Sequence, residues 1–135
     1  MARKRHLSRI AVMQVLFERG RHKDMDIMDA LAKNIGELGG ADEEFCAVLL
    51  EGTIAMEDEL QKDIETCAPE WDYEKMDPIA RPVLMIGAFE LLHADDAPPA
   101  VVMNECIEIA KEYGTEETGK FVNGVLNAMA KNTDS

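Results

Sequence analysis

The chain has 135 residues, the length of one ordinary domain, and its 14 Lys and Arg against 27 Asp and Glu give a formal net charge of −13. So acidic a balance argues, at first, against a nucleic-acid partner. The hydrophobic content of 47% is that of a globular protein with one core. No apolar run approaches the roughly 18 residues that cross a membrane, which excludes a membrane-spanning protein.

Apolar residues at helical spacing mark a first helix near the N-terminus. Its stripe consists of four residues, Ile10, Met13, Leu16 and Phe17. Gly20 is a plausible end for this helix. Because Arg9 lies off the stripe, we expect its side chain to stay solvated while the helix packs.

Two further helices are predicted in the first half of the chain. The second covers residues 26–38 and ends at the glycine pair that follows. Asp42 is a good N-cap for the third, because its short side chain can accept hydrogen bonds from the first free N–H groups. The apolar pattern then continues without interruption to Cys67, so one helix over residues 42–67 is expected.

Three more helices are predicted in the second half. The fourth starts at Asp77 and Pro78 and runs to residue 92, with Pro82 one turn in. The fifth covers residues 100–113 and the sixth is capped by Thr115. No stretch alternates as a strand does, and residues 131–135 are expected to fray. We therefore predict a single all-α domain of six or seven helices over residues 1–135.

The charge is unevenly distributed along the chain. Residues 1–23 have a net charge of +6, and residues 24–135 have a net charge of −19. Residues 1–9 form a basic arm with four cationic side chains: Arg3, Lys4, Arg5 and Arg9. Such an arm can bind RNA phosphates, but basic helical arms also bind anionic membranes, and an arm paired with the chain's own carboxylates is a third interpretation.

No motif for catalysis or for a cofactor is found. His6, His22 and His93 have no second ligand at metal-binding spacing, and the three cysteines lack a C-x-x-C pair. Three free thiols fit a reducing cytoplasm. We therefore expect no enzyme, no cofactor, no metal site and a cytoplasmic protein.

Two phrases in the last third of the sequence are distinctive. One runs from Asn104-Glu105 to Glu108-x-Ala110-Lys111, and the other is Lys120-Phe121-Val122-Asn123-Gly124-Val125-Leu126. At this separation they resemble the NusB family of bacterial transcription antitermination factors. The basic N-terminus and first helix are also similar to that family.

This resemblance implies a fold of two packed three-helix bundles and a non-catalytic function. Arg3, Lys4, Arg5 and Arg9 would bind the boxA element of ribosomal RNA leader transcripts. Phe17, Glu90 and Phe121 would contact NusE, a small-subunit ribosomal protein, and the pair would join the elongating RNA polymerase with other Nus factors.

Several alternatives stay open at this point. The chain could be a protein-only adaptor that has lost RNA binding, or a membrane-surface protein, and a homodimer could mask the arm. Asn104 and Glu105 could be structural or functional. For Asn123 and Gly124 we favour a structural role, in which the glycine permits close helix packing.

Overall fold

The computed structural model describes residues 2–133, and every regular element within them is helical. In chain order these are α1 (Ala2–Arg19), α2 (Ile27–Leu38), α3 (Glu43–Ala55), α4 (Glu57–Cys67), the 3-10 turn η1 (Tyr73–Lys75), α5 (Ala80–Leu92), α6 (Pro99–Tyr113) and α7 (Glu116–Thr133). The predicted all-α class is confirmed. None of the described helices is both long enough and apolar enough to cross a bilayer.

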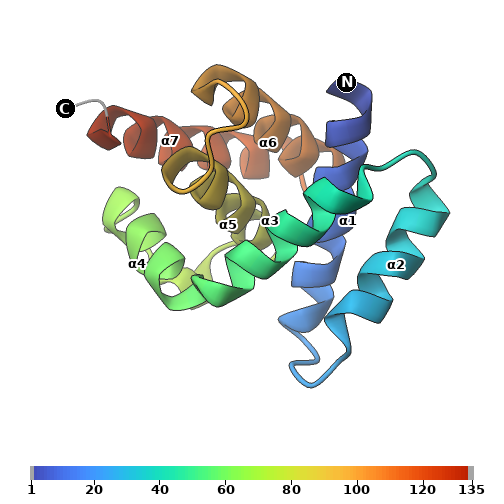
Figure 1. Cartoon of the computed structure of the whole chain (residues 1–135). Coiled ribbons are helices and arrows are strands. Elements are labelled where there is room, and N and C mark those ends of the chain that lie inside the picture. The colour runs from blue at the N-terminus through green and yellow to red at the C-terminus, as the bar shows by residue number, and fades with distance from the viewer. Residues whose placement is uncertain (1, 134–135) are drawn as a thin grey trace.

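The helices form two groups that meet at α5 (Figure 1). In the first group α1, α2 and α3 contact one another as a three-helix bundle. In the second, α5, α6 and α7 form another bundle, and α4 lies along α5 and α7. Because both α1 and α3 pack on α5, the N-terminal helix is attached directly to the centre of the second group.

The single helix predicted over residues 42–67 is wrong, because the chain leaves the helical conformation at Met56 (φ −109°, ψ 20°). The break lets α3 stay on α1 and α5 while α4 turns toward α5 and α7. Leu60 and Ile64 continue the apolar pattern and are fully buried. Since no proline or glycine marks the break, periodicity could not reveal it.

Most predicted helix ends are confirmed by their hydrogen bonds. The Asp26 carboxylate accepts from the first N–H groups of α2, and Asp42 accepts from Phe45 at the start of α3. The Asp77 carboxylate accepts from the N–H groups of Ile79 and Ala80. Helix α5 therefore begins two residues after the predicted start at Pro78.

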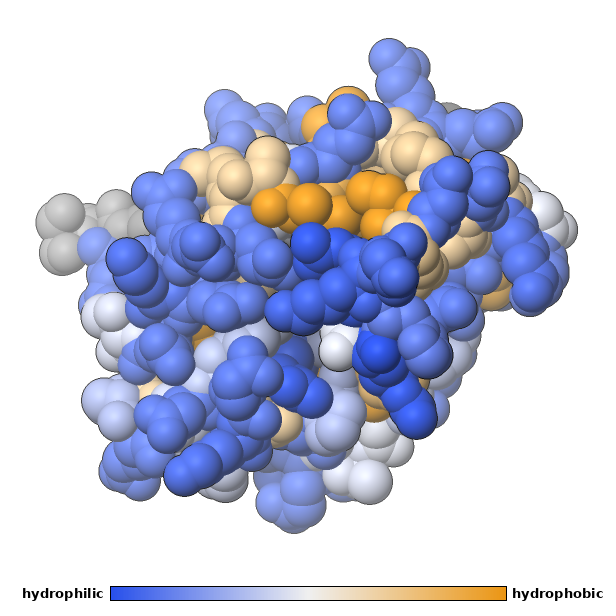
Figure 2. Space-filling model, turned by 90° about the horizontal axis from the view of Figure 1, so that it is seen from below, coloured by the Kyte–Doolittle hydropathy of each residue, from blue (hydrophilic) through white to orange (hydrophobic). Residues whose placement is uncertain are grey.

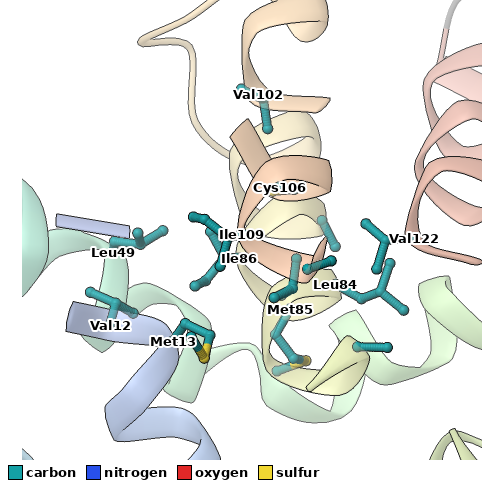
Figure 3. Packing of buried hydrophobic residues seen from close by; sticks show 14 of the residues in the cluster. Val12, Met13, Leu49, Leu84, Met85, Ile86, Val102, Cys106, Ile109 and Val122 are labelled. Carbon is teal, nitrogen blue, oxygen red and sulfur yellow. The ribbon is translucent and has the colours of Figure 1, made fainter. Parts of the chain in front are cut away.

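The core is centred on α5, whose residues 82–88 are all buried (Figure 3). All seven α-helices contribute to one buried apolar cluster. A Cβ atom on Gly52 of α3 would lie 2.3 Å from the Phe89 ring of α5, so only glycine allows this approach. The tight packing extends toward the C-terminal end of α5 and carries Glu90 inside the protein.

Both ends of the described chain are helical. Residues 2–9 of the basic arm are not a separate segment but the first turns of α1. Likewise Lys131 and Asn132, from the tail expected to fray, continue α7. Residues 1, 134 and 135 lie outside the described residues.

Candidate functional site

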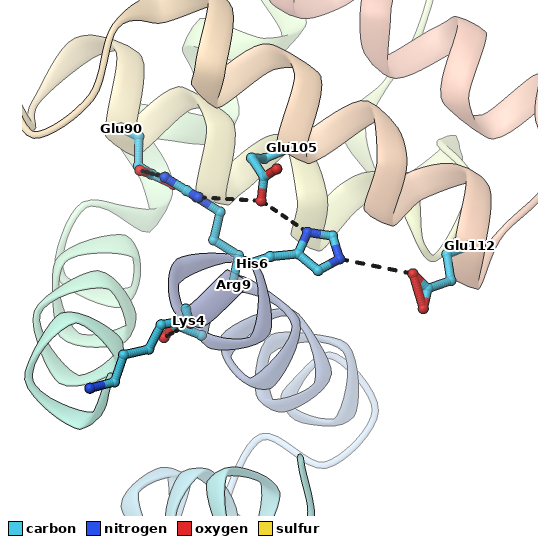
Figure 4. Close-up of polar contacts among 7 residues, drawn as sticks. Lys4, His6, Arg9, Glu90, Glu105 and Glu112 are labelled. Carbon is cyan, nitrogen blue, oxygen red and sulfur yellow. Dashed lines mark hydrogen bonds and ion pairs between the residues drawn. The ribbon is translucent and has the colours of Figure 1, made fainter. Parts of the chain in front are cut away.

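The exposed cations of the N-terminal helix are Arg3 and Lys4. Among residues 2–133, no carboxylate lies within ion-pair distance of either side chain. The Lys4 amine points away from the carboxylates of α5 and α6 (Figure 4). Both charges are therefore available to an external anion.

Arg5 is held in place by the chain itself. Its guanidinium lies 4.1 Å from the centre of the Phe45 ring, a cation–π contact. Its Nε atom is 4.0 Å from the Asp42 carboxylate, at the outer limit of an ion pair. Because 36% of its side chain is exposed, Arg5 can still donate hydrogen bonds to a phosphate.

The solvated position expected for Arg9 is wrong, and so is the surface position expected for Glu90. Arg9 Nε and Nη2 donate to the two Glu90 oxygens at 2.7 and 2.8 Å, and the two side chains are 2% and 3% exposed. The pair is bidentate, because each Glu90 oxygen accepts one of these bonds, and Figure 4 shows the two side chains meeting end to end. Arg9 lies off the apolar stripe, yet α5 packs over that side of α1. Neither group can reach a ligand without breaking this pair.

Glu105 of α6 links the arm to the second group of helices. One of its oxygens lies 2.9 Å from His6 Nδ1 and 3.6 Å from Arg9 Nη1. Glu112, about two turns further along the same face of α6, lies 4.0 Å from His6 Nε2 (Figure 4). Asn104, which precedes Glu105 in the sequence, is exposed. Glu105 thus has a structural role, which is to dock the arm on α6.

Two groups of this buried cluster, Arg9 and Cys106, have shifted pKa values. Burial alone would lower the pKa of Arg9, but its hydrogen bonds to Glu90 and that group's charge more than offset this and raise the pKa. The adjacent Cys106 thiol is fully buried, and burial together with the charge of Glu90 raises its pKa. Both groups therefore keep their protons, and Cys106 is an unreactive thiol.

The two aromatic residues predicted to contact a partner lie on different helices. Phe17 on α1 is half-buried, and the Arg21 guanidinium lies 5.9 Å from its ring centre. Phe121 on α7 is half-buried and packs edge-to-face against Trp71, with ring centres 5.7 Å apart. Trp71 is 48% exposed and was not predicted as a site residue, because no motif surrounds it.

Asn123 and Gly124 do not have the structural role that we favoured. Both are exposed on α7, and a Cβ atom on Gly124 would meet no atom within 4 Å. Close helix packing therefore does not explain this glycine. The pair belongs to the outer face of α7.

Two hollows flank Phe17. The apolar groove, of about 430 Å³, is lined by Met13, Phe17, Ile79 and Tyr113 among others. The basic cleft, of about 340 Å³, is lined by Phe17, Arg19, Arg21, Lys23, Tyr73 and Arg81 together with carboxylates. The loop between α1 and α2 lies lowest in Figure 1, so the view from below in Figure 2 looks toward this end of α1. That face carries an apolar strip beside strongly hydrophilic side chains.

Within residues 2–133 no group of three or more His, Cys, Asp or Glu side chains is placed to hold a metal ion. Cys46, Cys67 and Cys106 are free thiols. The arrangement around α1 offers charge and aromatic surface for binding.

Comparison with known proteins gives a consistent result. The model of the NusB family matches residues 6–131. A transcription antitermination protein NusB from Desulfitobacterium hafniense is 32% identical, over 96% of this chain and 90% of its own length. The structure of NusB from T. maritima is 33% identical, covers 94% of this chain and 90% of its own, and has a TM-score of 0.85. A chain from a structure of antitermination factors NusB and NusE with dsRNA shares the fold, with 24% identity, a TM-score of 0.86, and coverage of 98% of this chain and 99% of its own.

Proposed function

The chain belongs to the NusB family, and from this premise we propose that it is a non-catalytic RNA-binding factor for transcription antitermination. It binds boxA-type RNA of ribosomal RNA leader transcripts together with NusE. The complex then joins RNA polymerase and other Nus factors on the nascent transcript. Such a factor works in the cytoplasm, where bacterial transcripts are made.

The observation that carries this proposal is the exposed positive charge on the first turn of α1. Among the described residues, no carboxylate pairs with Arg3 or Lys4, and Arg5 is partly exposed beside them. Since residues 24–135 have a net charge of −19, RNA is repelled by most of the surface and attracted to this end. The charge distribution therefore gives the RNA both a site and an orientation.

Arg9 and Glu90 serve this function indirectly. Their buried pair fixes α1 against α5, and Glu105 fixes His6 against α6. The first turn of α1 is thereby presented on a rigid base, and less conformational entropy is lost when RNA binds. We assign these residues to positioning the arm, and not to contact with phosphates.

For NusE we propose two aromatic contacts. Phe17 would contact NusE with the side of its ring that lines the apolar groove, and Phe121 would do so beside the exposed Trp71 ring. Half-buried aromatic side chains of this kind are frequent anchors of protein interfaces. The NusB–NusE–dsRNA complex of a protein with the same fold is the precedent for this pairing. A homodimer of the free protein would mask the arm and would compete with RNA.

One observation favours a second candidate, a protein-only adaptor. Arg5, His6 and Arg9 are already in contact with the chain's own carboxylates, which leaves few cations for RNA. In that case the protein would bind NusE and retain no RNA.

An RNA-binding assay decides between the two candidates. We would measure affinity for boxA-type and scrambled RNA, with and without NusE, at two salt concentrations. The test variant is Arg3→Ala/Lys4→Ala/Arg5→Ala. The matched control, Lys33→Ala/Lys62→Ala/Lys131→Ala, removes three charges from exposed positions on α2, α4 and α7.

The proposal expects the arm variant to lose roughly tenfold or more in affinity for boxA RNA, and the control to stay close to wild type. Equal RNA affinity of wild type and arm variant would overturn the RNA assignment. NusE binding without any RNA retention would establish the adaptor instead.

A further inference from the structure

The positive charge of residues 1–23 lies toward both ends of α1, and Arg3 and Lys4 account for only one of them. Arg19, Arg21 and Lys23 come at and just after the C-terminal end of the helix. An 18-residue helix is about 27 Å long. These cations are therefore a separate cluster, well removed from Arg3 and Lys4.

This second cluster lines the basic cleft between the end of α1, η1 and the start of α5. The cleft volume of about 340 Å³ lies within the range of small-ligand sites. It is large enough to receive one nucleotide unit of a chain. The cleft is therefore a hollow in which charge is concentrated.

Two of the four cations of the cleft are uncompensated. Among the described residues, no carboxylate lies within ion-pair distance of Arg21 or Lys23. Arg19 Nη1 lies 2.7 Å from the Glu57 carboxylate, but a guanidinium has four further N–H donors. The remaining cation, Arg81, is 3.4 Å from the exposed Glu74 carboxylate. The cleft thus has an excess of positive charge on a protein whose net charge is −13.

Aromatic rings lie among these cations. Phe17 and Tyr73 both line the cleft, and Arg21 lies over the Phe17 ring. Burial raises the pKa of Tyr73, so its hydroxyl keeps its proton. Unpaired bases stack on aromatic rings and on guanidinium planes while cations bind the phosphates. This combination is typical of single-strand RNA sites.

We propose that the basic cleft at the C-terminal end of α1 is a second contact for single-stranded RNA, occupied by the strand whose other part lies on Arg3 and Lys4. The inference rests on the proposed function, because the arm supplies the first contact. A strand held at one end of α1 reaches the cleft at a high effective concentration, so two weak contacts give one tighter complex. An acidic protein segment is the competing occupant, but it would leave the aromatic rings without a base to stack on.

The proposal predicts a dependence on RNA length. We would compare a boxA-type RNA with the same element extended by about ten nucleotides at each end, a length in the range of single-strand sites. The test variant is Arg21→Ala/Lys23→Ala, assayed without NusE. Its control, Lys33→Ala/Lys131→Ala, removes the same charge from exposed positions on α2 and α7.

For the extended RNA we expect the cleft variant to bind roughly tenfold more weakly at low salt. The slope of log K against log salt should fall by about 1.4, which is two phosphates at 0.7 each. For the short RNA the variant should match wild type, and the control should match wild type for both. Equal binding of the extended RNA by the cleft variant and wild type would overturn the proposal.

The failure of this inference is distinguishable from failure of the proposed function. If the arm variant Arg3→Ala/Lys4→Ala/Arg5→Ala weakens RNA binding while the cleft variant does not, only the second contact is refuted. If neither variant weakens it, both are refuted. If the cleft variant keeps its RNA affinity but loses binding to a polyglutamate peptide, the cleft receives an acidic protein segment.

Discussion

The first and third turns of α1 both carry cationic side chains, which are exposed in the first turn and buried in the third. Arg3 and Lys4 are exposed without a carboxylate partner among the described residues, whereas Arg9 is buried in a bidentate pair with Glu90. The difference arises because α5 and α6 cover the third turn and not the first. In an acidic protein, the charges that can attract RNA are those that packing leaves unpaired.

The largest effect is expected from breaking the buried pair of Arg9 and Glu90. Glu90→Ala leaves the Arg9 guanidinium without its partner in the core. We expect the free energy of unfolding to fall by about 3–5 kcal/mol, the usual cost of an unpaired buried charge. Urea denaturation measures this, with the exposed Glu108→Ala on α6 as the control that should stay within about 0.5 kcal/mol.

The double variant Arg9→Met/Glu90→Leu extends this test. Replacing both charges by apolar groups should recover most of the stability lost in Glu90→Ala. If Glu90→Ala unfolds at the same urea concentration as wild type, the pair is not buried as described.

A smaller effect, on RNA affinity, is expected from removing the exposed charges of the first turn. Arg3→Ala/Lys4→Ala should reduce affinity for boxA-type RNA roughly fivefold to tenfold, because two phosphate contacts are lost. Its stability should remain within about 0.5 kcal/mol of wild type, since neither side chain packs. Filter binding and urea denaturation measured on one preparation check both statements; loss of stability together with affinity would show that the first turn is structural.

The pH dependence of stability tests whether the Cys106 thiol is buried beside Arg9 and Glu90. Burial raises the pKa of its thiol above the ordinary value of 9.0, so the folded state keeps a proton that the unfolded chain loses. The contribution of this group to stability is complete below pH 9 and is lost as pH rises from there toward the folded pKa. The expected loss is about 1 kcal/mol between pH 9 and pH 10.

Cys106→Ala is the comparison for that pH series. Between pH 8 and pH 10 its stability should fall less steeply than that of wild type, although its absolute stability is lower because of the cavity. Parallel curves for the two proteins would contradict the burial of the thiol.

The smallest effect is expected at Gly124 on the exposed face of α7. Because a Cβ atom there meets nothing within 4 Å, Gly124→Ala should stabilise the helix by about 0.5–1 kcal/mol. Gly52→Ala, whose Cβ would clash with Phe89, is the opposite control and should destabilise by about 1–3 kcal/mol. A destabilised Gly124→Ala would show that the outer face of α7 is covered by something else.

The sequence predicted the parts of the fold that local rules determine. The cap at Asp42 and the ends of α1 and α6 follow from a short side chain and from glycines, which act within one turn. The break at Met56 follows from the packing of α4 on distant helices, which no local pattern contains.

The candidate site was likewise predicted only in part from the sequence. The density of cations identified the arm, but whether each cation is free depends on helices about 80 and 100 residues away, as Glu90 and Glu105 show. The solvated position expected for Arg9 was therefore wrong, whereas Arg3 and Lys4 are exposed and their binding to RNA stays a prediction. Trp71 was missed because only the fold brings it to Phe121.

The salt dependence of RNA binding tests the central claim most directly, that the first turn of α1 binds RNA through its free cations. For a boxA-type RNA confined to the arm, log K for wild type should fall with log salt at a slope of roughly −2, from three phosphates at 0.7 each. The arm variant Arg3→Ala/Lys4→Ala/Arg5→Ala should show a slope near zero and the control Lys33→Ala/Lys62→Ala/Lys131→Ala should match wild type. A wild-type affinity that does not change with salt, or an unchanged slope in the arm variant, would contradict the account.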